Sequence, residues 1–399
     1  MSAGGLPRRA DVVVVGGGAN GTSTAFHLAK LGMKNVVLLE RRQLAAGATG
    51  KSGSLVRMHY TNEVESRMAM ESLKVFQNFG DVVGGDCGWS PVGFVQLVKH
   101  EHREALHRNV ARQQKLGIDT RLIDDKELRE LLPGVSLDDL GGAAYEKSSG
   151  YADPNATAFG FAAGAQRLGA RIETGVPVTR VLVDNGRVAG VETPQGRISA
   201  PTVVLVPGAW SNPLLAPLGL ELPLTPFRIQ ISIFRWPPGW TRRHPVVIDA
   251  VHHSWMRPEG ANSTLIGVEL GRSGADPETY DEGVDPQFVE DARATLAARL
   301  PAFGDATMRG GWAGMIMMSD DGRPIIDQFP SVPGLYGMLG DSGTSFKTSP
   351  AIGRCLAEWI AHGQPQLVDL TPFRSTRFAE GKPWVDEDHY GKERLTISR

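Results

Sequence analysis

A strand-to-turn junction near the start of the chain constrains the fold more than any other feature: the run Val12–Val15 leads directly into a glycine-rich turn, residues 16–21. A continuous β-branched run is typical of a strand that is buried on both faces. Residues 22–31 place apolar residues among polar ones as a helix does, and a second apolar run follows at Val36–Leu39. The sequence therefore predicts a βαβ unit from residue 11 to residue 40.

Three glycines of this turn have the spacing of a dinucleotide-binding fingerprint. Gly16 permits the tight turn, Gly18 lets the backbone approach a pyrophosphate, and Gly21 allows close packing of the helix on the strand. The N-terminus of the following helix offers free N–H groups and the positive end of the helix dipole to the phosphates. The pattern predicts a bound dinucleotide.

An acidic residue and two arginines follow the second strand. Glu40 stands 19 residues after Gly21, where its carboxylate is placed to accept hydrogen bonds from both ribose hydroxyls. Arg41 and Arg42 either hold a 2′-phosphate or are solvated surface side chains, and Glu40 argues against the phosphate.

A second glycine-rich turn, residues 340–350, follows an apolar run near the end of the chain and precedes a helical pattern. It places another helix N-terminus and Lys347 against a developing negative charge. A reduced flavin carries such a charge at N1 and the C2 carbonyl, so the arrangement suits FAD better than NAD.

Composition excludes several other classes of function. Lys and Arg total 42 against 44 Asp and Glu, so the net charge of −2 gives no electrostatic case for nucleic acid. Two cysteines cannot form a disulfide framework or a four-thiolate metal site, and no metal site is expected. No stretch approaches about 18 uninterrupted apolar residues, so no membrane span is expected. The first residues show no signal peptide, and the cytoplasm is the expected location.

The rest of the chain mixes helical and strand patterns. Helices are expected at 101–116, 125–132, 289–300 and 349–360, and strands at 202–206, 229–234, 246–250 and 264–270, the last three in an antiparallel sheet. The turn Asp184-Asn185-Gly186 predicts a hairpin within 176–193. The last thirty or so residues are polar and are expected to form a surface tail.

Four further stretches make the chain resemble the D-amino-acid-oxidase-like FAD amine oxidoreductases, especially sarcosine oxidases, the β-subunit of heterotetrameric sarcosine oxidase, and glycine oxidase. Residues 47–57 resemble the family's second flavin loop, and 207–211 its "AGAWS" strand end. Residues 311–326 resemble its "WAG…PDG.PIIG" element, and 342–347 its "SGHGFK" turn. The resemblance runs from about Asp11 to about Ile360.

The resemblance implies an α/β fold in which a Rossmann-type FAD-binding domain is interleaved with an antiparallel-sheet substrate domain. The expected FAD-binding domain comprises 1–88, 150–225 and 305–370, the substrate-binding domain 89–149 and 226–304, and the tail 371–399.

The resemblance also implies a set of residues around FAD. They are Gly16, Gly18, Ala19, Asn20, Gly21, Glu40, Arg41, Arg42, Thr49, Gly50, Lys51, Ser52, Val178, Gly208, Trp210, Gly314, Gly340, Ser342, Gly343, Thr344, Ser345, Phe346 and Lys347. Relatives that attach the flavin covalently use a histidine in the second loop, where this chain has Lys51, or a cysteine in the third element, where it has Gly314 or Met315. FAD is therefore expected to bind non-covalently.

Two residues correspond to the family's anchors for a substrate carboxylate. Arg57 falls on an arginine that pairs with the carboxylate, and Lys347 on a lysine that holds it from the other side, near the flavin C2 carbonyl. The alternative for Arg57 is a structural salt bridge. These two are the expected catalytic residues.

Further residues are expected along the substrate pocket. Tyr60, Met256 and Ile316 are expected to line it, and Glu269 either favours a cationic substrate or pairs with a strand neighbour. Leu265 stands where monomeric sarcosine oxidases carry a lysine that promotes reaction with O₂, so an oxidase and a dehydrogenase both remain open.

The implied reaction is oxidation of the C–N bond of a secondary amine or amino acid. Hydride passes to flavin N5, the resulting imine hydrolyses, and electrons leave to O₂ or to an electron-acceptor partner. The alternatives are an electron-transfer or partner-dependent subunit and, with the least support, a pyridine-nucleotide dehydrogenase; an oligomer is compatible with each.

Overall fold

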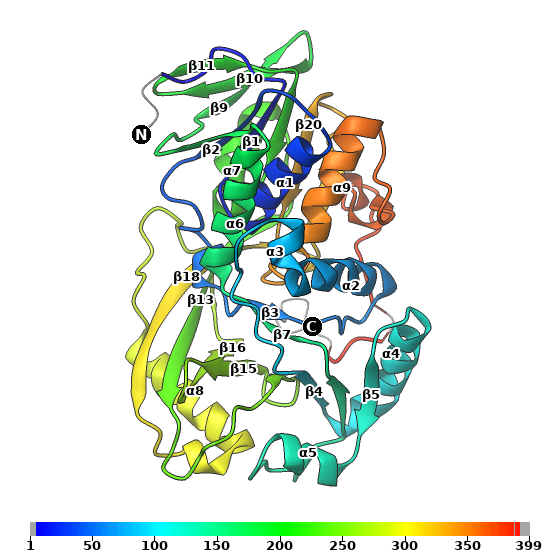
Figure 1. Ribbon diagram of the computed structural model, residues 1–399, viewed down its shortest axis with the longest axis vertical. Coiled ribbons are helices and arrows are strands. Elements are labelled where there is room, and N and C mark those ends of the chain that lie inside the picture. The colour runs from blue at the N-terminus through cyan, green and yellow to red at the C-terminus, as the bar shows by residue number, and fades with distance from the viewer. Residues whose placement is uncertain (1–4, 387, 392–399) are drawn as a thin grey trace.

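The computed structural model describes residues 5–386 and 388–391, which form two lobes along the long axis of the molecule (Figure 1). One lobe contains β1, α1 and α9, and the other contains β4, α4 and α8. Within the described part of the chain, no helix is long and apolar enough to cross a membrane.

The first lobe is built on a sheet that is parallel except at the edge strand β19. Its strands, in spatial order, are β19 (Ile325–Gln328), β20 (Leu335–Leu339), β12 (Thr202–Leu205), β1 (Val12–Val15), β2 (Val36–Glu40) and β8 (Arg171–Thr174). A small sheet of β11 (Gly196–Ser199), β10 (Arg187–Thr193) and β9 (Arg180–Asp184) accompanies it.

Both faces of this first sheet are buried. Val12 and Val14 point to a cluster shared with α1 (Ala19–Lys30), α6 (Pro154–Arg167) and α9 (Ser349–His362). Val13 and Val15 point to a second cluster shared with the small sheet. The alternation along β1 explains why the strand is apolar at every position.

The helix and the hairpin predicted for this lobe are confirmed, and the start of the helix is shifted by a few residues. Helix α1 begins at Ala19, three residues before the predicted start, because Gly18 is extended and caps it. The predicted hairpin is present between β9 and β10, with Asn185 and Gly186 both at positive φ (48° and 76°).

The second lobe is built on a larger sheet. Its strands, in spatial order, are β17 (Arg272–Ser273), β13 (Leu224–Arg235), β16 (Ser263–Val268), β15 (Ser254–Glu259), β14 (Val246–Asp249), β4 (Phe94–Val98), β6 (Gly142–Glu146) and β5 (Thr120–Ile123), and β18 (Met308–Ser319) also pairs with β13. The sheet is mixed rather than purely antiparallel, because β14 and β4 run parallel.

Strand β18 lies close to a predicted domain boundary. It pairs antiparallel with β13 from Met308 to Ser319, so residues 308–319 belong to the second sheet. The chain returns to the first sheet at β19, and the boundary at residue 305 stays a prediction. The α/β class and the interleaving of the two sheets are confirmed.

The remaining helices cover the two sheets and the junction between them. They are α2 (Glu63–Gln77), α3 (Phe79–Val82), α4 (Arg103–Lys115), α5 (Asp125–Leu131), α7 (Ser211–Leu215) and α8 (Pro286–Arg299). Helix α2 contacts α9, α4 contacts β5 and β6, and α8 contacts β13 and β16. A short ribbon of β3 (Leu55–Val56) and β7 (Gly150–Tyr151) lies between the lobes (Figure 1).

The expected C-terminal surface tail is wrong for the residues that the structure describes; residues 387 and 392–399 lie outside them. After α9 the chain runs back past α2 toward α4 (Figure 1). Phe373 and Arg377 are fully buried, and Arg377 pairs with Asp321. The polar composition predicted a solvated segment, but Arg377 and Asp386 are paired with the buried residues Asp321 and Arg323.

Candidate active site

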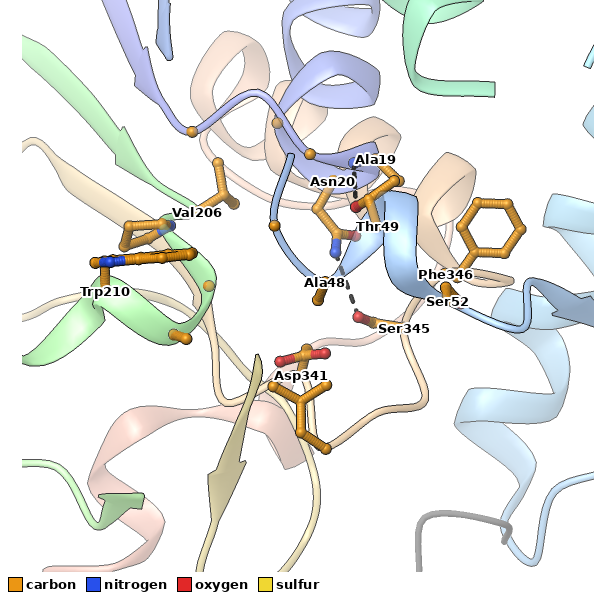
Figure 2. A pocket seen from close by; sticks show the side chains of 18 of the residues that line it. Ala19, Asn20, Ala48, Thr49, Ser52, Val206, Trp210, Asp341, Ser345 and Phe346 are labelled. Atoms are coloured by element: carbon orange, nitrogen blue, oxygen red, sulfur yellow. Dashed lines mark hydrogen bonds between the residues drawn. The ribbon is translucent and has the colours of Figure 1, made fainter. Parts of the chain in front are cut away.

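A cavity of about 470 Å³ lies where the two lobes meet, and both glycine-rich turns line it (Figure 2). The first lobe contributes residues 15–21, 39–42 and 206–210, and the segment that leads into β3 contributes 46–49 and 52–55. The turn near the end of the chain contributes 340, 341, 343 and 345–347. Segments that are far apart in the sequence therefore converge on one site.

The first turn has the close approaches that its glycines predict. Gly16 has a φ of 114°, and a Cβ atom there would lie 2.3 Å from the carbonyl oxygen of Val206. A Cβ atom at Gly21 would lie 1.9 Å from the carbonyl oxygen of Gly16. These contacts bring α1 directly onto the turn, as a pyrophosphate cradle requires.

Substitution of Gly21 by alanine is expected to weaken FAD retention and to destabilise the fold by about 1–3 kcal/mol, because α1 must move off the turn. FAD release into an ultrafiltrate and urea unfolding measure the two effects. Gly304→Ala is the matched control, because its Cβ would meet only the Pro301 carbonyl oxygen at 3.5 Å. Equal FAD retention in both variants would contradict the predicted role of Gly21.

The start of α1 links the first turn to two other segments (Figure 2). The backbone N–H of Ala19 donates to Oγ1 of Thr49 at 3.0 Å, and the Asn20 amide donates to Oγ of Ser345 at 3.3 Å. Oδ1 of Asn20 is buried and has no hydrogen-bond partner within the described residues. A buried polar atom of this kind on a cavity wall fits a polar ligand.

The acidic residue after the second strand also faces the cavity. The Glu40 carboxylate accepts the backbone N–H groups of Gly17 and Arg42, each at 2.7 Å, so its orientation is fixed. Each of its oxygens keeps further acceptor capacity for a ribose hydroxyl.

The two arginines after Glu40 are occupied by acidic side chains. Arg41 lies 5.0 Å from the Trp210 ring and pairs with Glu278 at 2.6 Å, and Arg42 lies 3.8 Å from Glu282. Because both arginines pair with acidic side chains, neither is reserved for a 2′-phosphate of the dinucleotide.

The two predicted anchors share the cavity wall. Nζ of Lys347 donates to the carbonyl oxygen of Thr344 at 2.9 Å, and burial followed by the charge of Arg57 lowers the pKa of Lys347 well below its ordinary value. The Arg57 guanidinium lies between two rings, 4.7 Å from Tyr60 and 5.7 Å from Phe94.

The hydrogen bonding of Arg57 is incomplete. Its Nε and Nη1 are buried without a partner in the part of the chain that the structure describes, and no ion pair there includes it. The structural salt bridge considered for Arg57 is therefore not present among those residues. A guanidinium in such a position is suited to bind a carboxylate ligand with its free donors.

Most of the residues expected around the cofactor do line the cavity. Those that do are Gly16, Gly18, Ala19, Asn20, Gly21, Glu40, Arg41, Arg42, Thr49, Ser52, Val178, Gly208, Trp210, Gly340, Gly343, Ser345, Phe346 and Lys347. Those outside the lining set are Gly50, Lys51, Gly314, Ser342 and Thr344. Lys51 turns away because Nζ pairs with Glu282 at 2.6 Å and with the Tyr280 hydroxyl at 2.9 Å.

Three of the expected substrate residues do not line the cavity. Met256 lies in the apolar cluster that includes residues of α8, because strand alternation directs its neighbour Trp255 to the cavity instead. The Glu269 carboxylate lies outside the lining set, 3.7 Å from Nδ1 of His253. Tyr60 lies outside the lining set and contacts the second glycine-rich turn, since its hydroxyl donates to the Thr344 carbonyl oxygen at 2.9 Å.

The sequence did not reveal several residues that line the cavity. Asp341 lies in the second glycine-rich turn, and burial raises its pKa to about 6. Ile248, Trp255 and Val268 make much of the second sheet's part of the wall apolar, together with Ile229 and the predicted Ile316, and Gln230 of β13 adds a polar side chain. The alternation of β15 was the available signal for Trp255.

Comparisons with known proteins agree with this geometry. The chain is 28% identical to the sarcosine oxidase subunit beta of Rhodobacter capsulatus over 95% of this chain and 91% of that protein. Its fold matches an L-proline dehydrogenase of P. horikoshii with a TM-score of 0.87 and 26% identity, over 94% of this chain and all of that one.

A glycine oxidase of Geobacillus kaustophilus matches with a TM-score of 0.81 and 23% identity, over 93% of this chain and 99% of that one. Residues 11–359 match the family model described as FAD dependent oxidoreductase. The family model spans both lobes and every segment that lines the cavity, and the chain belongs to this family of FAD-dependent oxidoreductases.

Proposed function

We propose that the chain oxidises the C–N bond of a secondary amine or amino acid that carries a carboxylate. The proposal is supported by the state of the Arg57 side chain. Its buried Nε and Nη1 have no hydrogen-bond partner among the described residues, and Arg57 lines the cavity in which FAD is proposed to bind. An unpaired buried guanidinium is costly, and an anionic ligand offsets that cost. The relatives named above act on sarcosine and proline, which both fit this class.

FAD supplies the hydride acceptor when it is bound. The residues of the chain then hold the substrate: Arg57 offers a fork of donors to the carboxylate, and Lys347 approaches from the second glycine-rich turn. Positioning of the substrate carbon is the main contribution expected of the protein. The apolar wall at Ile248, Trp255 and Ile316 excludes water from the reacting atoms.

FAD is proposed to bind without a covalent bond. Among the described residues that line the cavity there is no histidine and no cysteine. Cys87 and Cys355 are buried in the core of the first lobe, outside the lining set. Denaturation with acid should therefore release all of the flavin into the supernatant.

The electron acceptor is proposed to be O₂ or a protein partner. The lysine expected of an O₂-reactive relative is replaced by Leu265, which is fully buried in β16 outside the lining set. The name of the Rhodobacter relative, a subunit beta, supports a partner chain. A purely electron-transferring subunit is the weaker alternative, because Arg57 and Lys347 already form a substrate anchor.

Anaerobic reduction of the flavin tests the proposed function. The purified chain with added FAD is mixed with sarcosine, proline and other N-alkyl amino acids, and with matched amines that lack the carboxylate. Bleaching of the oxidised-flavin band by the carboxylate-bearing amines alone is the expected result. No bleaching by any member of the panel, with FAD bound, would overturn the proposal.

A further inference from the structure

The C-terminal residues contact the segment that carries Arg57. The Asp386 carboxylate accepts the Thr61 hydroxyl and pairs with Arg323. Tyr390 lies against His59, with its hydroxyl 2.7 Å from Nε2 and the two rings stacked at 5.8 Å. Residues 59 and 61 therefore both have partners in the chain's last described residues.

These C-terminal residues are themselves anchored on α4. Asp388 pairs with Arg108 at 2.6 Å and with Arg112, and its carbonyl oxygen accepts the Asn109 amide at 2.8 Å. The Asn109 amide also donates to the Tyr390 hydroxyl at 2.8 Å. Tyr390 is thus held by α4 as well as by its contact with His59.

The direction of the second hydrogen bond follows from the first. Because the Tyr390 hydroxyl accepts from Asn109, its own hydrogen is available to donate to Nε2 of His59. Burial and then the charge of Arg57 lower the pKa of His59 to about 3, so the imidazole is neutral and accepts this hydrogen bond.

A row of rings connects this contact to the substrate anchor. The His59 ring lies 6.2 Å from the Phe94 ring, and Phe94 in turn lies 5.7 Å from the Arg57 guanidinium. Tyr60 bounds the guanidinium at 4.7 Å. Within the described residues the buried Nε and Nη1 of Arg57 have no hydrogen-bond partner, so ring packing has to fix its orientation.

We propose that Tyr390 is a positioning residue for binding of the substrate carboxylate. Through His59 and Phe94 it holds the Arg57 guanidinium in the orientation that binds this carboxylate. This inference rests on the proposed role of Arg57 in binding that carboxylate. It gives the C-terminal segment a part in substrate affinity that is separate from FAD binding, because Tyr390 lies outside the cavity lining.

A double-mutant cycle on the FAD-loaded protein tests the inference. The affinity for acetate, a carboxylate that cannot be oxidised as an amine, is measured from the change in the flavin absorption spectrum. Tyr390→Ala is expected to weaken acetate binding by roughly tenfold, with FAD retention unchanged. Tyr390→Phe keeps the ring and should retain most of the affinity.

The decisive comparison is made in the Arg57→Ala background. If Tyr390 acts through Arg57, the second substitution causes no further loss of acetate affinity there. An equal loss in both backgrounds, or no loss in either, overturns the inference. If Arg57→Ala alone leaves acetate affinity unchanged, the proposed function fails instead.

Two controls separate positioning from general destabilisation. Tyr336→Ala removes a half-buried tyrosine that packs on Trp359 at 6.0 Å, and acetate affinity should not change. If Tyr390→Ala does not fold, Asn109→Ala removes the anchor of the hydroxyl and should weaken acetate binding in the same direction. A folded Asn109→Ala variant with full affinity would contradict the inference.

Discussion

Arg57→Met should weaken the binding of carboxylate substrates by about thirtyfold or more and, at the same time, leave the ligand-free protein as stable as before or more stable. Loss of one partner of a buried charge pair costs about 2–5 kcal/mol of binding. The ligand-free protein loses nothing comparable, because the described residues provide no ion pair to Arg57. An apolar side chain of similar length also relieves the cost of burying the guanidinium.

The two measurements together distinguish an anchor from a structural residue. Spectral titration of the bound flavin gives the carboxylate affinity, and urea unfolding without ligand gives the free energy of unfolding. A structural salt bridge predicts the opposite pair of results: about 3–5 kcal/mol of lost stability and little selectivity for carboxylates. Arg57→Lys provides the conservative comparison, since it keeps the charge and loses the planar fork.

The first lobe could be predicted from the sequence because its signals are local. The four valines, the glycine spacing and Glu40 all lie within 30 residues, and the turn at Asn185-Gly186 determines its hairpin by backbone preference alone. The matching cavity could also be predicted in part, because the second glycine-rich turn follows a strand in the same way.

Two helices of the first lobe escaped prediction although they carry capping signals. The Asn62 side chain caps α2 by accepting from the Glu65 backbone, and the Asp153 side chain caps α6 in the same way at Ala156. The residues after the α6 cap are less clearly periodic, since small side chains such as Gly164 allow close contact with Phe26. The capping residues Asn62 and Asp153 were the sequence signals from which the starts of these two helices could have been predicted.

Errors in the substrate pocket have a different physical origin. Along β15, neighbouring side chains point to opposite faces of the sheet. The prediction placed Met256 at the cavity, but Trp255 faces the cavity and Met256 packs in the apolar cluster on the other face. The surroundings of Arg57 and the buried partners of the C-terminal segment depend on contacts between residues tens to hundreds of positions apart. No pattern within a short window reports such contacts.

Arg377→Met should strongly destabilise the protein although Arg377 lies outside the cavity. Its guanidinium donates two hydrogen bonds to Asp321, at 2.7 and 2.9 Å, and further ones to the carbonyl oxygens of Phe373 and Arg323. Removing it leaves a buried carboxylate without its main partner, which costs about 3–5 kcal/mol. Urea unfolding near neutral pH measures this loss.

The dependence of stability on pH gives this prediction its specific signature. Burial alone would raise the pKa of Asp321, but the hydrogen bonds and charge of Arg377 outweigh it and hold that pKa below its ordinary value. In the wild-type protein this contribution is complete above the unfolded pKa and is lost as the pH falls through the lower folded pKa. In Arg377→Met, burial raises the folded pKa, so part of the lost stability should return as the pH falls below it.

A neighbouring pair supplies the control. Arg374 bonds to Glu380 in the same segment, but both side chains are largely solvated, and Arg374→Met should change stability little. Arg377→Met combined with Asp321→Asn should recover part of the loss, since no buried charge is left. If Arg377→Met and Arg374→Met are equally mild, the buried pair of Arg377 with Asp321 contributes little to the stability of the fold, and the prediction is wrong.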